Sequence, residues 1–110
     1  MKRVEAFIKP HRLNKVVSAL HALPSFPGFS VLSLHGQGHG RGAGGHYAYG
    51  EGTLLLHESC LLVIVCEDQD AEHVAAAILQ SAYTGRQGDG IVLISEVTQL
   101  LRIRDAGASV

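Results

Sequence analysis

Two short stretches in the second half of the chain carry residues that could bind an anion. The first, TGRQGDG at residues 84–90, has three glycines among seven residues. Glycine backbones can turn several N–H groups toward one point, and such a concavity suits an anion. Asp89 adds an acceptor that suits a pair of hydroxyls or the edge of a base. The stretch is therefore a candidate ligand loop, although an ordinary turn from a helix to a strand has the same composition.

The second stretch, LLRIR at residues 100–104, carries two arginines. In an extended chain the alternation of side chains places Arg102 and Arg104 on one face, about 7 Å apart. Each guanidinium group can then hold a separate phosphate through paired hydrogen bonds. The alternative is a solvated strand edge whose charges oppose aggregation.

A glycine-rich run occupies residues 36–52, GQGHGRGAGGHYAYGEG. Glycine loses more backbone freedom on folding than any other residue, so this run is costly to order. Loops longer than about 12–15 residues inside a compact domain are usually functional or disordered. We expect residues 39–51 to be mobile when no partner is bound.

Histidines gather in or beside this run, at His35, His39, His46 and His57. Imidazole binds Zn, Cu and Ni, and flexible glycines could let several histidines converge on one ion. Their spacings are not those of a preformed site, and polar loop residues are the alternative. His11, His21 and His73 are expected on helix surfaces.

The hydrophobic pattern predicts four strands and two helices. The strands are expected at residues 3–8, 29–35, 53–66 and 91–96. The first helix should bury Leu13, Val16, Val17, Leu20 and Leu23. The second should begin at a cap formed by Asp68 or Asp70, end near Gly85, and bury Val74, Ala75, Ile78, Leu79 and Ala82. A short extended tail follows the last strand.

This order, βαββαβ, is typical of the ferredoxin-like α+β fold, with two helices on one face of a four-stranded antiparallel sheet and a long loop between strands two and three. Residues 60–66 are apolar at every position, so both faces of that strand need cover. We therefore expect a homo-oligomer that packs sheet against sheet. Cys60 and Cys66 lie too far apart along one strand for a disulfide and should be small buried apolar residues.

Composition excludes several classes of protein. Residues 1–110 suit a single domain, and 46% hydrophobic residues provide a sizeable core. The net charge of −1 gives no support for a nucleic-acid partner. The longest apolar run, residues 60–66, is too short to span a membrane, and the start, MKRVEAF, is not a signal peptide. A cytoplasmic protein without membrane insertion is expected.

Three longer stretches together resemble the PII signal-transduction family. VEAFIKPHRLNKVVSAL is similar to the opening strand and helix of that family, and GFSVLSLHGQG to the segment that leads into its flexible T-loop. SAYTGRQGDGIVLISEVTQLLRIR resembles the B-loop, the last strand and the arginine tail. Residues 36–52 fall where the T-loop lies.

The resemblance implies a homotrimer with three clefts between subunits, each of which binds an adenine nucleotide, AMP, ADP or ATP. It implies no catalysis, because such proteins report nucleotide state by moving the T-loop against a partner such as a membrane transporter or an enzyme. By carry-over, the nucleotide-binding residues are Ser30, Gly36, Gly38, Thr84, Gly88, Asp89, Gly90, Arg102 and Arg104. Among them, Thr84 would line the base and the two arginines would hold the phosphates.

Departures from the family pattern point to a divergent member. Ile91 stands where the family has a phosphate-contacting lysine, while Gly40 and Ser59 replace residues that serve Mg–ATP and 2-oxoglutarate. Gly52 replaces a tyrosine that some members modify, although Tyr47 and Tyr49 lie nearby. We expect nucleotide binding without 2-oxoglutarate sensing. The alternative is a metal-responsive PII-like protein that uses the loop histidines and is linked to metal transport.

An enzyme with the same fold, of the acylphosphatase type, is a further alternative. It would need an arginine in a phosphate cradle near the first turn. The corresponding stretch here is KPHRLN, and nothing pairs with it as a group that orients water. The sequence therefore predicts a regulator rather than an enzyme.

Overall fold

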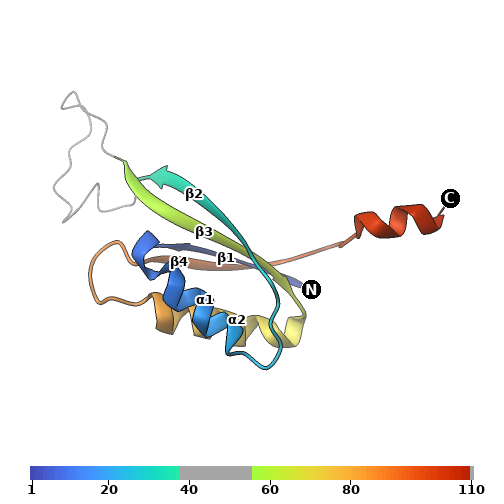
Figure 1. Cartoon of the computed structure of the whole chain (residues 1–110), viewed down its shortest axis with the longest axis horizontal. Helices are drawn as coiled ribbons and strands as arrows, with labels where there is room; N and C mark the ends of the chain where they lie inside the picture. Colours follow the sequence, from blue (N-terminus) through green and yellow to red (C-terminus); the bar gives the residue numbers. More distant parts are fainter. Residues whose placement is uncertain (38–55, 110) are drawn as a thin grey trace.

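The computed structural model describes residues 1–37 and 56–109. Its strands are β1 (Lys2–Ile8), β2 (Ser30–Gly36), β3 (His57–Cys66) and β4 (Gly90–Glu96). Its helices are α1 (Leu13–His21) and α2 (Asp68–Ala82), with short 3-10 helices η1 (Pro10–Arg12) and η3 (Ile103–Ser109). The strands form one antiparallel sheet in the order β2-β3-β1-β4, and both α-helices cover the same face (Figure 1). The predicted ferredoxin-like α+β fold is confirmed.

The core lies between the sheet and the two helices. Alternate residues of β1 and β3 point toward the helices, as strand geometry requires. The cluster consists of Val4, Ala6, Ile8, Val16, Leu20, Cys60, Leu62, Ile64, Cys66, Ala71, Val74, Ile78 and Ala82. Both cysteines are free and buried, as predicted, and burial raises the pKa of the Cys66 thiol.

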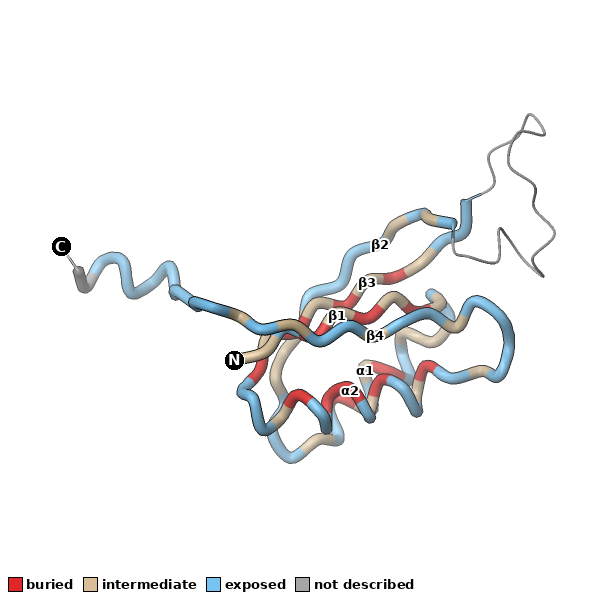
Figure 2. The backbone as a smooth tube through the Cα atoms, turned by 180° about the vertical axis from the view of Figure 1, so that it is seen from behind, coloured by how far each residue is buried: buried red, intermediate tan, exposed pale blue. Residues whose placement is uncertain are grey.

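The opposite face of the sheet carries apolar side chains that no other element of the described residues covers. One row of paired apolar residues crosses the sheet from β2 to β4. In this row Leu61 of β3 lies between Leu32 of β2 and Phe7 of β1, and Phe7 in turn pairs with Ile91 of β4. Leu32, Ile91 and Leu93 remain 50%, 57% and 46% exposed. Figure 2 shows that buried residues gather on β1, β3 and the helices, whereas β2 and β4 are largely exposed. We call this surface the open face.

The N-terminal end of α2 differs from the expectation. Neither Asp68 nor Asp70 is the cap; Glu67 occupies that position with an extended backbone and without a capping side-chain hydrogen bond. The two aspartates lie in the first turn, where negative charge faces the positive end of the helix dipole. Asp68 also pairs with the N-terminal amine of Met1, 2.8 Å from its Oδ1.

One predicted core residue of α2 is on the outside. Leu79 is 59% exposed, while its neighbour Ile78 is fully buried. Successive helical residues are rotated by about 100°, and here that rotation turns Leu79 past the edge of the buried stripe. The helix ends at Ala82, before the left-handed Gly85. His11, His21 and His73 are exposed, as predicted.

The tail after β4 is not a continuous extended strand. It leaves the sheet and then coils into η3, so the alternation that would put Arg102 and Arg104 on one face ends at Ile103. Leu101 and Ile103 are 78% and 93% exposed, and the tail projects away from the domain (Figure 1). The corrected geometry leaves both arginines exposed.

Some expectations about the fold concern residues outside the described ranges. The predicted strand start at 53–55 and the predicted mobility of residues 39–51 both lie there. Among the residues that the structure describes, every helix is too short or too polar to cross a bilayer.

Candidate functional site

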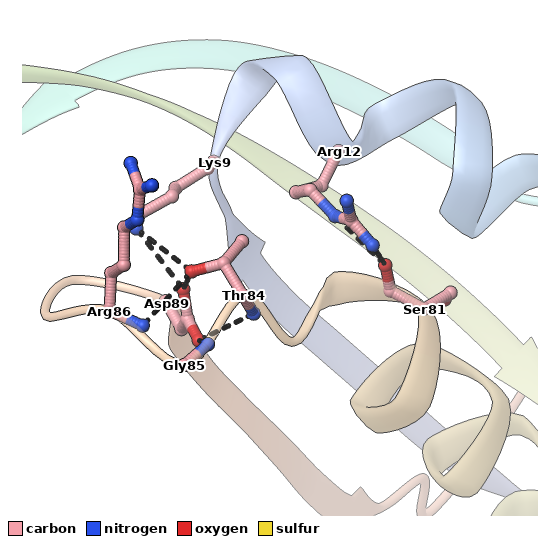
Figure 3. A network of polar contacts seen from close by, with 7 residues as sticks. All are labelled: Lys9, Arg12, Ser81, Thr84, Gly85, Arg86 and Asp89. Carbon is pink, nitrogen blue, oxygen red and sulfur yellow. Dashed lines mark hydrogen bonds and ion pairs between the residues drawn. The ribbon is translucent and has the colours of Figure 1, made fainter.

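The loop at residues 84–90 is closed by its own aspartate. Asp89 Oδ2 accepts hydrogen bonds from the backbone N–H groups of Thr84, at 2.8 Å, and Gly85, at 3.1 Å (Figure 3). Its Oδ1 accepts from the Thr84 hydroxyl. That hydroxyl oxygen in turn accepts from the Arg86 N–H at 3.2 Å. The backbone concavity that the glycines predict does form, and an internal carboxylate occupies it.

A lysine from the other end of the sequence completes this cluster. Lys9 follows β1, and its Nζ lies 3.1 Å from Asp89 Oδ1 and 3.3 Å from Thr84 Oγ1. The side chains of Lys9 and Asp89 are only 22% and 23% exposed. A charge-assisted contact in such a shielded position is stronger than an ordinary surface pair. We refer to Lys9, Thr84 and Asp89 as the clasp.

These contacts explain the acidity of Asp89. Its pKa lies far below the ordinary value, chiefly because the carboxylate accepts hydrogen bonds from the hydroxyl and the N–H of Thr84. Lys9 and the Gly85 N–H lower the pKa further, against partial desolvation. Four donors fill the acceptor sites of a carboxylate. The structure therefore gives Asp89 an internal partner set, and its contact with a ligand hydroxyl or base stays a prediction.

The last residue of the loop must be glycine. Gly90 has φ +110°, and a Cβ there would lie 1.7 Å from the Phe7 carbonyl oxygen. This close approach arises because β4 begins at Gly90, which pairs with Ile8 at the end of β1. Gly88 also has a positive φ of +78°. The loop therefore joins the sheet at a fixed position, Gly90, where β4 begins.

A second cation holds the chain just before the loop. Arg12, in η1, donates from Nε and Nη2 to the Ser81 carbonyl oxygen, at 3.0 and 2.6 Å. This carbonyl lies in the last turn of α2, where carbonyl groups lack helical partners. Arg12 therefore ends α2 at a defined place relative to α1 (Figure 3).

A hollow of about 300 Å³ lies beside the loop. Asp89 and Gly90 form its polar end. Its remaining lining is mostly apolar and comes from β1, β4, α2 and the residue that follows α2, namely Phe7, Ile8, Ile78, Leu79, Ala82, Tyr83, Ile91 and Val92. Tyr83 and Ile91 are 69% and 57% exposed at its rim. The hollow is open, so a ligand there would need a further wall.

Within one chain, the predicted nucleotide residues lie in three separate places. Ser30 and Gly36 are on β2 at one edge of the sheet, and residues 84–90 are at the opposite edge, beside β4. Arg102 and Arg104 lie on the tail. Of the predicted residues, only Thr84, Gly88, Asp89 and Gly90 come together, and Gly38 lies outside the described ranges.

The histidine candidates do not converge where the structure describes them. His35 pairs in register with Glu58, and its Nε2 lies 3.8 Å from Glu58 Oε1. His57 pairs with Gly36, one position along, so it points to the other face of the sheet. His39 and His46 lie outside the described residues. Within the described ranges, no three metal-ligating side chains are grouped.

The sequence did not indicate that Lys9 and Arg12 contact the segment around the 84–90 loop. The sequence indicates only that the first strand ends at residue 8 and that KPHRLN lacks a phosphate cradle. The contacts join residues 69 and 75 positions apart. The available signal was the pairing of the first and last strands, which brings the end of one beside the start of the other.

The fold and the loop agree with the resemblance found in the sequence. A ferredoxin-like domain with a glycine loop after its second helix and a long segment between β2 and β3 is the arrangement expected of a PII-type regulator. The chain matches the family described as "Nitrogen regulatory protein P-II" over residues 1–107, and it belongs to that family. The family consists of regulators rather than enzymes, in agreement with the prediction.

Individual relatives agree over nearly the whole chain. The proteins named nitrogen regulatory protein P-II from Azospirillum brasilense and Rhizobium meliloti (strain 1021) are each 36% identical over 104 residues. The protein of the same name from Porphyra purpurea is 33% identical over 104 residues. In each case the match covers 94% of this chain and 92% of the relative.

Proposed function

We propose that this protein binds an adenine nucleotide in clefts between the subunits of a homotrimer and controls a protein partner through residues 36–52. The partner class is a membrane transporter or an enzyme. Thr84 and residues 88–90 form one wall of the cleft, and the arginines of the neighbouring subunit form the other. The proposal extends the family membership by a ligand, an assembly and a target.

The observation that carries the proposal is the separation of the loop from the arginines. The loop precedes β4, whereas the tail leaves the opposite end of that strand (Figure 1). A strand of seven residues covers about 20 Å, so Arg102 and Arg104 cannot reach the loop of their own chain. A ligand held by both groups needs a second copy of the chain.

The open face supports an assembly of several copies. Its exposed leucines and isoleucine lie on a contiguous apolar surface of a kind that soluble monomers rarely expose. A cyclic arrangement with three-fold symmetry would bury this face and give identical clefts between neighbours. The exposed apolar residues of the tail, Leu101 and Ile103, would be covered in the same assembly.

The loop itself has room for a phosphate. In the described part of the chain, the N–H groups of Gln87 and Gly88 make no hydrogen bond, while those of Thr84, Gly85 and Arg86 are used internally. Free N–H groups at a glycine turn suit an anionic ligand. Two arginines of a neighbour would then neutralise the remaining phosphate charge.

Calorimetry with ADP tests this function. Arg102→Ala/Arg104→Ala should weaken ADP binding at least ten- to a hundred-fold, because each charge-assisted pair contributes about 1.5–3 kcal/mol. Lys15→Ala is the control, since Lys15 is an exposed cation on α1, on the helix side of the sheet and away from the open face. Equal ADP affinity in the double variant and the parent would refute the phosphate assignment.

A further inference from the structure

We propose that the turn from Lys9 to Arg12 is a bracket that positions the 84–90 loop for its ligand. This inference rests on the proposed nucleotide function and adds two positioning residues to it. Neither residue needs to touch the ligand, because each acts through the segment that it holds. The contacts in Figure 3 support the inference in three steps.

The first step concerns the rigidity of the turn. Lys9 is the residue before a proline, which restricts its backbone to the extended region that it adopts, φ −67° and ψ 136°. Its carbonyl oxygen accepts a hydrogen bond from the Arg12 N–H at 3.0 Å. The preceding residue, Ile8, is fastened in β1 and accepts a hydrogen bond from Ser59. The two cations therefore start from a fixed backbone.

The second step concerns where the two cations end. Residues three apart in a 3-10 turn project from the same side of it, so Lys9 and Arg12 reach toward one strip of the molecule. Arg12 holds Ser81, before the loop, and Lys9 holds Thr84 and Asp89, within it. Both ends of the helix-to-loop segment are thus attached to one turn.

The third step concerns what the bracket leaves free. With Asp89 satisfied by the clasp, the N–H groups of Gln87 and Gly88 remain unpaired within the described ranges. Gly90 fixes the exit of the loop, because its backbone approaches Phe7 too closely for any side chain. The loop is therefore held in shape before a ligand arrives, and binding need not supply its ordering entropy.

Amide hydrogen exchange in the full-length, ligand-free protein tests the bracket directly. Lys9→Met should speed exchange at the Thr84 and Gly85 amides about three- to tenfold, and Lys9→Arg should restore slow exchange. Arg12→Met should act in the same direction from the other end of the segment. Lys15→Met is the matched control, since Lys15 is exposed on α1, and it should change nothing.

Calorimetry with ADP on the same variants tests whether the bracket affects ligand binding. Lys9→Met should weaken ADP binding about three- to tenfold, and Lys9→Arg should return it to the parental value. Unchanged exchange in both Lys9→Met and Arg12→Met would overturn the bracket, as would faster exchange with unaltered ADP affinity. If the parent binds no ADP, the nucleotide function fails, and the exchange rates still decide whether the bracket shapes the loop.

Discussion

At the scale of single residues, the loop is specified by a few side chains with several partners each. Asp89 serves as the internal anion of a backbone concavity, and Lys9 and Thr84 hold it there. The sequence revealed the concavity through its glycines, but not its occupant. An aspartate inside a glycine loop suits a ligand contact and an internal anchor equally well, and only the spatial position of Thr84 and Lys9 distinguishes the two.

Gly90 provides the most sensitive test at this scale. Gly90→Ala should destabilise the fold by at least about 4 kcal/mol, because the new Cβ would collide with the Phe7 carbonyl oxygen at 1.7 Å. Denaturant unfolding at a fixed protein concentration measures the effect. Gly107→Ala is the control, since a Cβ there has open space, and a similar loss in both variants would contradict the proposed strand contact.

Asp89 should also leave a signature in the pH dependence of stability. Its folded-state pKa is lowered, so the ionised carboxylate contributes stability above the ordinary aspartate pKa of about 3.9. That contribution should be lost as the pH falls below about 3.9, toward the folded-state pKa. Asp89→Asn should therefore be less stable than the parent at neutral pH, with the difference shrinking in acid. A difference independent of pH down to acid unfolding would contradict the clasp.

At the scale of elements, the sequence predicted what periodicity controls. The alternation of β1 and the order of the elements were correct. Of the predicted stripe of α1, Val16 and Leu20 are buried, whereas Leu13 and Val17 are only partly buried and Leu23 lies beyond the helix end. Errors arose where tertiary contacts decide. At the start of α2, Glu67 occupies the cap position and Asp68 pairs with the Met1 amine, and the tail coils into η3 although its sequence alternates. Lys9 and Arg12 could not be placed because strand pairing, not sequence proximity, brings them to the loop.

Two neighbouring residues of α2 test the orientation of that helix. Ile78→Ala should cost about 2–5 kcal/mol of unfolding free energy, because it leaves a cavity in the core. Leu79→Ala should change stability by no more than about 0.5 kcal/mol, since Leu79 is largely exposed. Equilibrium urea unfolding at one protein concentration compares the two. Equal losses would mean that the helix presents both side chains to the interior.

At the scale of the whole molecule, the predicted ligand residues are dispersed. The loop, the β2 edge and the arginine tail lie apart, and the described residues leave the open face uncovered. The sequence predicted a homo-oligomer from the apolar residues of β3. In the structure the apolar side chains of the open face extend across all four strands, and Leu32, Ile91 and Leu93 are 50%, 57% and 46% exposed.

A charge on the open face should prevent assembly without unfolding the chain. Leu93 pairs in register with Glu5, so Leu93→Asp would place a second carboxylate beside an existing one within an apolar interface. Light scattering should report a mass near that of one chain, 11.7 kDa, while circular dichroism stays native. Leu79→Asp, on the helix side, is the control and should keep the parental mass. An unchanged mass in Leu93→Asp would contradict sheet-to-sheet packing.

Subunit complementation tests the shared cleft most directly. Two variants are each expected to lose ADP binding, Arg102→Ala/Arg104→Ala through the tail and Asp89→Ala through the loop. In a mixed cyclic trimer, one cleft joins an intact loop to the intact arginines of a neighbour. Each mixed trimer then has one intact cleft, and random assembly of equal amounts makes three-quarters of the trimers mixed. Calorimetry after unfolding and refolding the two variants together should therefore recover ADP binding at about one cleft in four, with near-parental affinity. Mixtures that bind no more ADP than the separate variants would contradict a site shared between subunits.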